Sequence, residues 1–580
     1  MQRSATADGP RIAYFSMEIA LAADIPTYAG GLGVLAGDIL RSAADLEVPI
    51  VGVTLLHRKG YFRQHLDASG NQTETPSLWS PEETLEPLDA VVSVEIEGRE
   101  VKVRPWRYTV HGSNGADVPV LLLDTAMAEN EERDRALTNH LYGGDQRYRL
   151  CQEVVLGMGG VAVLEALGLD GELIYHMNEG HSALLSLALM EGLLERAGDD
   201  AVTPERVDAI RRKCVFTTHT PVPAGHDQFP QEMVRGILGE QRTAQLTQSG
   251  CLLDGVLNMT YLGLHCSRYV NGVSMRHGEV SLGMFPGYPI HAITNGVHAA
   301  TWVCGALAEL YDRHIPGWRH DNRYLRYAIQ IPLHEIQSHH ARAKRELLAA
   351  VENLSGVKLR EDVLTIGFAR RATPYKRADL LLRDMDRLHS IARRVGPIQV
   401  IYGGKAHPYD QPGKDMIRNI YHRAGEVEDG VRIAYLENYN MALAKLMVSG
   451  ADLWLNTPRR PQEASGTSGM KAACNGVPSL SVLDGWWIEG HIEGVTGWSI
   501  PHGHTAPDDE GSEVGALYEK LERVILPLYY GAAPGYAGVM RSSIALNASF
   551  FNTQRVVSQY LRNAYAHPGG AEIDAWTLSL

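Results

Sequence analysis

The 580-residue chain has little cysteine and no long apolar run. Its six cysteines form no CxxC pair and have no histidine at metal-ligand spacing, so neither a disulfide framework nor a zinc site is expected. No run of about 18 apolar residues predicts a membrane span, and the N-terminus lacks the apolar core of a secretion signal. These absences predict a cytoplasmic protein without a bound metal.

Positive charge is also scarce. The chain carries 54 Lys plus Arg against 68 Asp plus Glu, a formal net charge of −14. Nucleic-acid binding needs a surplus of uncompensated cations, so this balance disfavours a nucleic-acid ligand while leaving local basic pockets open. At roughly 100–200 residues per domain, the length predicts two large domains with a cleft between them.

Short β-branched runs alternate with glycine-rich loops and amphipathic helical patterns along the whole chain. This alternation predicts an α/β protein with mainly parallel sheets. The expected strands are 11–16, 50–55, 213–217, 363–368, 398–402, 431–435 and 451–455, with an antiparallel insertion over 91–123. We expect doubly wound domains at 1–305 and 306–580, the second ending in a closing helix over 539–564 that packs across both. His339 and His340 are expected to be solvated or interfacial.

A glycine loop, Gly30-Gly31-Leu32-Gly33, follows the first expected strand and leads into a helical pattern. Glycines at such a position let backbone N–H groups approach an anion at a helix N-terminus. On its own this loop fits a plain tight turn equally well.

A basic loop follows the strand expected at 363–368. It holds Arg370, Arg371, Lys376 and Arg377, and a cation cluster at the end of a strand suits phosphate groups. A solvated basic turn is the alternative interpretation.

A third loop, 456–471, combines hydroxyl groups, glycines and Lys471 at the start of an expected helix. A lysine facing a cleft could contact phosphate, or form a Schiff base if desolvation lowers its pKa. The alternative is an ordinary surface lysine.

Taken together, these segments resemble those of a known family. The stretch 463–471, continued by 475–478 and 484–487, resembles the pyridoxal-phosphate segment of α-glucan phosphorylases, most closely of their short bacterial and archaeal branch. Further matches follow in family order and cover nearly the whole chain: 14–18, 30–33, 176–181, 216–221, 270–273, 294–297, 370–377 and 403–406. The resemblance implies two Rossmann-like domains facing across a cleft, the GT-B arrangement.

The resemblance also implies a cofactor site. Lys471 would hold pyridoxal 5′-phosphate, and the cofactor's phosphate rather than its ring would assist the reaction. The other implied cofactor-binding positions are Gly466, Thr467, Arg370 (where the family more often has lysine), Tyr439 and Trp302.

The implied reaction is reversible phosphorolysis of the non-reducing-end glucosyl unit of an α-1,4-glucan such as maltodextrin, glycogen or starch. Phosphate would protonate the glycosidic oxygen and then attack the same face, giving α-glucose 1-phosphate with retention and without the carboxylate pair of glycosidases. The residues implied to handle phosphate are Arg371, Lys376 and the Gly31 amide. The residues implied to hold the glucosyl unit or glucan are His219, Asn295, Glu463, Ser465, Gly30, Leu32, Glu179, His181 and Tyr375.

The first recognisable motif begins at residue 11, so the N-terminal extension that carries phosphorylation and nucleotide control in longer relatives is not expected, nor is that regulation. Two alternatives stay open: a nucleotide-sugar glucan synthase of the same fold, and a catalytically silent glycan-binding protein. The sequence also leaves open the preferred glucan, the direction in the cell, other effectors and a homo-oligomeric state.

Overall fold

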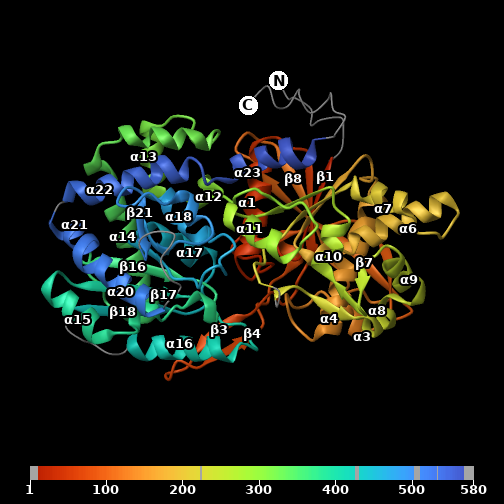
Figure 1. Cartoon of the computed structure of the whole chain (residues 1–580), viewed down its shortest axis with the longest axis horizontal. Coiled ribbons are helices and arrows are strands. Elements are labelled where there is room, and N and C mark those ends of the chain that lie inside the picture. The colour runs from red at the N-terminus through yellow and green to blue at the C-terminus, as the bar shows by residue number, and fades with distance from the viewer. Residues whose placement is uncertain (1–10, 223–224, 425–429, 502–509, 532, 567–580) are drawn as a thin grey trace. The chain divides into compact units, whose positions relative to one another are not determined.

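A computed structural model describes residues 11–222, 225–424, 430–501, 510–531 and 533–566 of the chain (Figure 1). Its contacts divide the chain into two compact units. Of the described residues, the first contains those up to Tyr61, Pro76–Thr294 and those from Val556 onward, and the second contains those of Phe62–Thr75 and Asn295–Arg555. This division differs from the expected single boundary near residue 305, because Phe62–Thr75 joins the second unit and the C-terminal segment returns to the first.

The first unit is built on a mostly parallel sheet in the order β15-β14-β10-β9-β1-β2-β8-β7-β5, with β6 paired to β7. The strands are β1 Ile12–Ser16, β2 Ile50–Leu55, β5 Glu86–Pro87, β6 Val92–Ile96, β7 Arg99–His111, β8 Asp117–Asp124, β9 Ile174–Asn178, β10 Cys214–Thr217, β14 Tyr269–Gly272 and β15 His291–Ala292. Strands β5, β6 and β8 pair antiparallel with β7, which confirms the expected antiparallel insertion.

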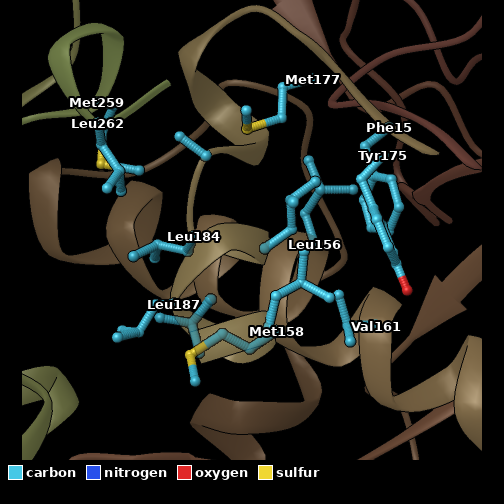
Figure 2. Packing of buried hydrophobic residues seen from close by; sticks show 14 of the residues in the cluster. Phe15, Leu156, Met158, Val161, Tyr175, Met177, Leu184, Leu187, Met259 and Leu262 are labelled. Atoms are coloured by element: carbon cyan, nitrogen blue, oxygen red, sulfur yellow. The ribbon is translucent and has the colours of Figure 1, made fainter. Parts of the chain in front are cut away.

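Apolar side chains cover both faces of this sheet, which explains why β1 and β2 are continuous apolar runs. One face, which carries Phe15, packs against helical segments that supply Leu156, Val161 and Leu187 (Figure 2). Gly160 permits close packing there, since a Cβ at that position would lie 2.4 Å from the ring of Phe15. The main helical segments of the unit are α1 Gly31–Asp45, α4 Gln146–Val154, η1 Val155–Gly159, α5 Gly160–Ala166, α6 Leu185–Ala197, α7 Pro204–Arg211, α8 Gln231–Leu238, α9 Glu240–Gln248, α10 Met259–His265 and α11 Met275–Met284.

The opposite face of the sheet packs against α1 and the C-terminal segment. Tyr565 and Tyr560 lie in this segment, and their hydroxyl groups bond His176 Nδ1 at 2.6 Å and Thr217 Oγ1 at 3.0 Å. The single closing helix expected over 539–564 is instead divided into α22 Ala533–Ser542, η8 Ser543–Ala548, α23 Thr553–Tyr560 and η9 Leu561–Tyr565. The break allows the end of the chain to leave the second unit and complete the core of the first.

The second unit contains a fully parallel six-stranded sheet in the order β18-β17-β16-β19-β20-β21. The strands are β16 Leu364–Ala369, β17 Ile398–Gly403, β18 Val431–Leu436, β19 Leu453–Asn456, β20 Ser479–Val482 and β21 Gly497–Ile500. The main helical segments are α12 Ala299–Trp302, α13 Gly305–His314, η4 Asn322–Gln330, α14 Leu333–Ser355, α15 Met385–Arg394, α16 Gln411–Ala424, α17 Met441–Gly450, α18 Thr467–Cys474, α20 Glu510–Lys520 and α21 Leu526–Gly531. All seven expected strands are thus confirmed, and the chain is an α/β protein.

A hairpin from the N-terminal half of the chain belongs to the second unit. Its strands are β3 Arg63–Leu66 and β4 Gln72–Thr75, and β4 lies beside α16 (Figure 1). Gln64 Nε2 donates to Gly404 O at 3.1 Å, and Gln72 Nε2 donates to Ala406 O at 2.9 Å. These bonds attach the hairpin to the loop after β17.

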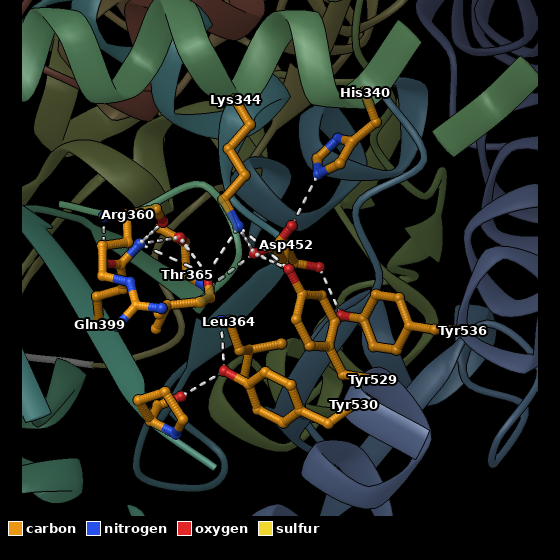
Figure 3. Close-up of polar contacts among 12 residues, drawn as sticks. His340, Lys344, Arg360, Leu364, Thr365, Gln399, Asp452, Tyr529, Tyr530 and Tyr536 are labelled. Carbon is orange, nitrogen blue, oxygen red and sulfur yellow. Dashed lines mark hydrogen bonds and ion pairs between the residues drawn. The ribbon is translucent and has the colours of Figure 1, made fainter. Parts of the chain in front are cut away.

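A buried polar cluster joins α14 to the amino ends of β16 and β19 (Figure 3). Asp452 Oδ2 accepts from Lys344 Nζ at 2.6 Å and from the Thr365 amide at 2.7 Å, while Oδ1 lies 3.0 Å from His340 Nε2. Removing one partner from such a buried pair typically costs about 3–5 kcal/mol. Of the two environments expected for His339 and His340, the solvated one is wrong, because both side chains are buried and His340 bonds Asp452 where α14 meets the sheet.

Within the part of the chain that the structure describes, no helix is both long and apolar enough to cross a membrane. The same residues contain no group of three or more His, Cys, Asp or Glu side chains placed to hold a metal ion.

Candidate active site

In the first unit, the predicted residues gather where the strand order reverses. Strand β1 lies between β2 and β9, so the sheet has a switch point there, and ligands of open α/β sheets bind at the carboxyl ends of strands beside such a point. Ser16 of β1 pairs in register with Asn178 of β9, which pairs with Thr217 of β10. The residues that follow these three strand ends are therefore brought together.

Asn178 bonds His219 directly. Its Oδ1 lies 2.7 Å from His219 Nε2, and its Nδ2 donates to Ser16 Oγ at 3.1 Å. Because Asn178 also sits at the centre of the three strand ends, it fixes the orientation of the imidazole.

Glu179 adopts an unusual backbone conformation for a residue with a side chain, with φ 78° and ψ 165°. Its carboxylate accepts from the His219 amide at 2.8 Å, the Thr220 hydroxyl at 3.0 Å and the Gly180 amide at 3.1 Å. Burial alone would raise the pKa of Glu179, but the nearby histidines and the His219 amide bring it below its usual value. Glu179 is thus an ionised anchor for the 219–220 turn.

His181 belongs to a cluster that the sequence analysis missed. Asp227 Oδ2 lies 3.4 Å from His181 Nε2 and 2.5 Å from Arg149 Nη2, and the Tyr142 ring packs against His181 with centroids 5.5 Å apart. Asp227 follows the segment 216–221 in the sequence, but no local pattern there indicates that it contacts His181.

Four buried imidazoles of the first unit make its stability pH-dependent. Burial lowers their pKa to about 4 in His57, His219 and His277 and to about 3 in His176. The unfolded chain takes up these protons near pH 6.5, so between about pH 6.5 and 4 the unfolded state binds more protons. The free energy of unfolding is therefore expected to fall as the pH falls through this window.

Thermal unfolding measured from pH 8 to pH 4.5 tests this expectation. His57→Gln should give a shallower decline, since the amide can still donate to Met17 O, the partner of His57 Nε2 at 2.9 Å. His111→Gln, at an exposed position, should retain the wild-type slope. Equal slopes for wild type and His57→Gln would contradict the prediction.

The glycine loop leads into α1, whose first residue is Gly31. No atom lies within 4 Å of a Cβ built at Gly30 or Gly31, whereas a Cβ at Gly37 would lie 2.1 Å from Ala20 O. The first turn of α1 contains no acidic side chain, and Gly30 provides no side-chain cap. Leu32 follows, half buried. The loop therefore offers open space at a helix N-terminus, which suits an anion.

In the second unit, three predicted residues form one buried ion cluster. Lys376 Nζ lies 2.9 and 2.8 Å from the two carboxylate oxygens of Glu463, and Arg370 bonds Glu463 and Asn456 through Nη1. Burial would raise the pKa of Glu463, but Arg370 and Lys376 lower it to about 2. The cluster follows β16 and β19, where the strand order of this sheet reverses.

The cations of the basic loop differ in burial and in their bonding partners. Arg371 is exposed, and Lys376 Nζ lies 4.5 Å from the ring centroid of Tyr375. Burial raises and the adjacent cations lower the pKa of Tyr375, which ends below its usual value. Arg377 is instead buried, bonded to Glu513 and to the carbonyl oxygens of residues 457 and 458. Arg377 is therefore committed to structure rather than to a ligand, contrary to the interpretation of all four cations as one phosphate cluster.

Lys471 lies on α18, which starts after Gly466 in a left-handed conformation with φ 90° and ψ 47°. Its Nζ lies 4.0 Å from the ring centroid of Trp302, and both side chains are buried. Asn475 connects the two segments, donating to Trp302 O at 2.9 Å and accepting from the Cys304 amide at 2.9 Å. Two residues expected beside one cofactor, 169 positions apart in sequence, are thus in contact.

The remaining predicted residues of the second unit are Thr467, Ser465, Tyr439 and Asn295. Thr467 begins α18, and the Ser465 hydroxyl is buried without a hydrogen-bond partner among the described residues. Tyr439 packs beside Gly403, with its ring 3.2 Å from a Cβ built there. Asn295 is buried, and its carbonyl oxygen accepts from Arg555 at 2.9 Å. In this unit the contacts thus join Arg370, Lys376 and Glu463 in one group and Lys471 and Trp302 in another.

Two α/β units with polar and charged residues at both switch points define the class of α/β proteins that bind polar and anionic ligands. A family model described as carbohydrate phosphorylase matches residues 241–497. A maltodextrin phosphorylase of Thermococcus litoralis is 37% identical over 96% of this chain and 70% of its own length. Glycogen phosphorylases of Mycobacterium tuberculosis and Aquifex aeolicus are 37% and 35% identical, over 97% and 96% of this chain and 72% and 86% of their own. The chain belongs to the carbohydrate phosphorylase family, and it is an enzyme, a glycosyltransferase of the phosphorylase type.

Proposed function

We propose that this enzyme is an α-1,4-glucan phosphorylase that transfers the non-reducing-end glucosyl unit of a glucan to inorganic phosphate and releases α-glucose 1-phosphate with retention. The similarity to maltodextrin and glycogen phosphorylases over most of the chain supports the reaction class. The observation that carries it is the second-unit site, where Lys471 lies on Trp302 and Glu463 is held by two cations. The two units would face each other in the GT-B arrangement, since each sheet has residues proposed to bind ligand at its switch point.

The residues around Lys471 fit pyridoxal 5′-phosphate. The lysine amine is buried beside an aromatic ring, as a desolvated Schiff-base lysine requires. Gly466 and Thr467 form a helix N-terminus that suits a phosphate group, and the Ser465 hydroxyl nearby in sequence has no partner among the described residues. Arg370 and Tyr439 complete the proposed set. When bound, the cofactor supplies a phosphate group that can hold a proton beside the substrate phosphate.

The proposed substrate phosphate is held by cations and a helix end. Arg371 is exposed. Lys376 and Arg370 both pair with the single carboxylate of Glu463, so this group has one more positive than negative charge. Gly31 presents its backbone amide at the start of α1. Together they would offset the repulsion between adjacent phosphates and favour the anion that develops as the proton leaves.

The proposed glucosyl site uses hydrogen-bonding groups that do not titrate near neutral pH. His219 has a pKa of about 4 and is therefore neutral, so its imidazole can bond a sugar hydroxyl without adding charge. Glu463 is ionised and accepts hydrogen bonds, while Asn295 adds an amide group. In the reaction, substrate phosphate protonates the glycosidic oxygen, the bond to the anomeric carbon breaks, and phosphate attacks the same face. Glu179 and His181, with Gly30, Leu32, Ser465 and Tyr375, would complete the sugar contacts.

An assay with maltodextrin and inorganic phosphate tests this function. Release of glucose 1-phosphate that depends on phosphate is the expected result, and glycogen and starch assayed in parallel identify the preferred glucan. Transfer from a sugar nucleotide without phosphate dependence would support the glucan synthase instead. Glucan binding without turnover under any phosphate concentration would indicate a silent binding protein.

A further inference from the structure

Glu18 lies at the switch point of the first unit, two residues after β1, and has no role in the site described so far. Its side chain is buried, with 3% of the residue exposed. Carboxylate oxygen Oε2 accepts from the Ala29 amide at 2.6 Å and the Gly30 amide at 3.1 Å, and Oε1 accepts from the Tyr142 hydroxyl at 3.0 Å. One carboxylate therefore joins the start of the glycine loop to Tyr142.

The glycines of the loop serve two different purposes. A Cβ at Gly33 would lie 2.6 Å from Glu18 Oε2 and 2.8 Å from Tyr28 Cβ, so glycine is needed there to leave room for the carboxylate. A Cβ at Gly30 or Gly31 would meet no atom within 4 Å. The third glycine thus admits Glu18, whereas the first two keep the opposite side open for a ligand.

The backbone around Glu18 is held in place independently of its side chain. Ser16 Oγ donates to Glu18 O at 2.8 Å, and the Ala20 amide donates to Gly33 O at 2.9 Å. The carboxylate therefore projects from a fixed main chain onto the loop. On its other side, the Tyr142 ring packs on His181 and lies 5.3 Å from the Arg149 guanidinium.

We infer that Glu18 is the positioning residue of the phosphate loop, an inference that rests on the proposed phosphorylase function. The two amides that donate to the Glu18 carboxylate belong to Ala29 and Gly30, which precede Gly31. The carboxylate therefore fixes the start of α1 and leaves the Gly31 amide available to a ligand. Charge-assisted bonds to two successive amides restrict the loop to one conformation. Glu18 thereby prepares the Gly31 amide for substrate phosphate and does not contact the substrate.

Glu18→Gln tests this role, because glutamine keeps the size but removes the charge. Its single oxygen can accept from the two amides only through neutral hydrogen bonds, with its NH2 group turned to the Tyr142 hydroxyl. We expect kcat/KM for phosphate, and for glucose 1-phosphate in the reverse direction, to fall roughly 10-fold, the factor for replacing charge-assisted hydrogen bonds by neutral ones. The KM for the glucan should change less, by about threefold at most, since only Gly30 and Leu32 of the proposed sugar contacts lie on this loop. A purely structural role would lower the amount of folded protein without this selectivity.

Two further variants strengthen the test. Gly33→Ala should show at least the same phosphate defect, since its Cβ displaces both the Glu18 carboxylate and Tyr28. The double variant should be no worse than Gly33→Ala, because alanine already removes the Glu18 contact. Tyr142→Phe should give a smaller defect in the same direction, and it decides the question if Glu18→Gln does not fold. Glu82→Gln, with a side chain 58% exposed and paired only with Arg58 at 3.4 Å among the described residues, should match wild type.

The outcomes separate the two claims. Wild-type kinetics for phosphate in folded Glu18→Gln, or equal losses for phosphate and glucan, would overturn the role of Glu18 and leave the phosphorylase function standing. Wild-type enzyme that releases no glucose 1-phosphate would overturn the proposed function and this role with it.

Discussion

Lys471→Ala is expected to lose all phosphate-dependent release of glucose 1-phosphate together with bound pyridoxal phosphate. Lys471 is buried on α18 with its amine 4.0 Å from the centroid of the Trp302 ring. It is the lysine that the family resemblance implies as the cofactor's attachment point. A Schiff base needs a primary amine, which alanine lacks. The loss should therefore be one of chemistry rather than of fold.

The measurements are the absorbance spectrum of the purified protein and the glucose 1-phosphate assay. Wild type should show the absorbance of pyridoxal phosphate, and Lys471→Ala should show none while unfolding within a few degrees of wild type. Lys445→Ala, an exposed lysine on the neighbouring helix α17, is the matched control and should keep both cofactor and activity. Full activity in Lys471→Ala would refute the assignment of the cofactor site.

Glu463→Gln is expected to lower kcat about 100- to 1,000-fold, the range for removing one electrostatic contact to a transition state. The substitution keeps the shape but removes the charge that lies between Arg370 and Lys376. Both cations then lose their ionised partner inside the protein, which also destabilises the fold. Glu361→Gln, at an exposed carboxylate paired with Arg345 at 3.4 Å, should match wild type in both respects.

The same variant should change the acid stability of the protein. The pKa of Glu463 is about 2 in the folded protein and near 4.5 in the unfolded chain. A lowered folded pKa contributes stability above the unfolded value and loses it as the pH falls through about 4.5 to 2. Wild type should therefore lose more unfolding free energy than Glu463→Gln between pH 5 and pH 3. Parallel decline of the two proteins would show that Glu463 is not ionised in the folded state.

Local pattern was sufficient to predict most of the fold. Buried parallel strands are apolar on both faces, so β1, β2, β16 and β17 stand out as mainly apolar runs between glycine-rich loops. The same pattern indicated the loops that carry the site, because ligands of open α/β sheets bind after the carboxyl ends of strands. These local patterns did not predict which residues of different loops contact each other.

Local sequence could not predict which residues form ion pairs and hydrogen bonds with each other. Arg377 and Lys376 are neighbours in the chain, yet Arg377 is bonded to Glu513 and Lys376 to Glu463, far along the sequence in either case. His340 reads as an ordinary helix histidine, but the fold places it 3.0 Å from Asp452. In each case the environment depends on a segment that only folding brings near.

The sequence by itself determined the α/β class, the positions of seven strands along the chain, the three loops proposed to carry the chemistry and the resemblance to α-glucan phosphorylases. Each of these depends on short-range patterns of apolar, glycine and charged residues, which act within one strand, loop or helix. The tertiary structure alone decided the division into units, in which Phe62–Thr75 belongs to the second unit and the C-terminal segment to the first. It also decided the partners of Glu463 and the contact of Glu18 with the glycine loop. These depend on which strands pair, and strand pairing is a long-range property that sets the burial and charge of every group at the strand ends.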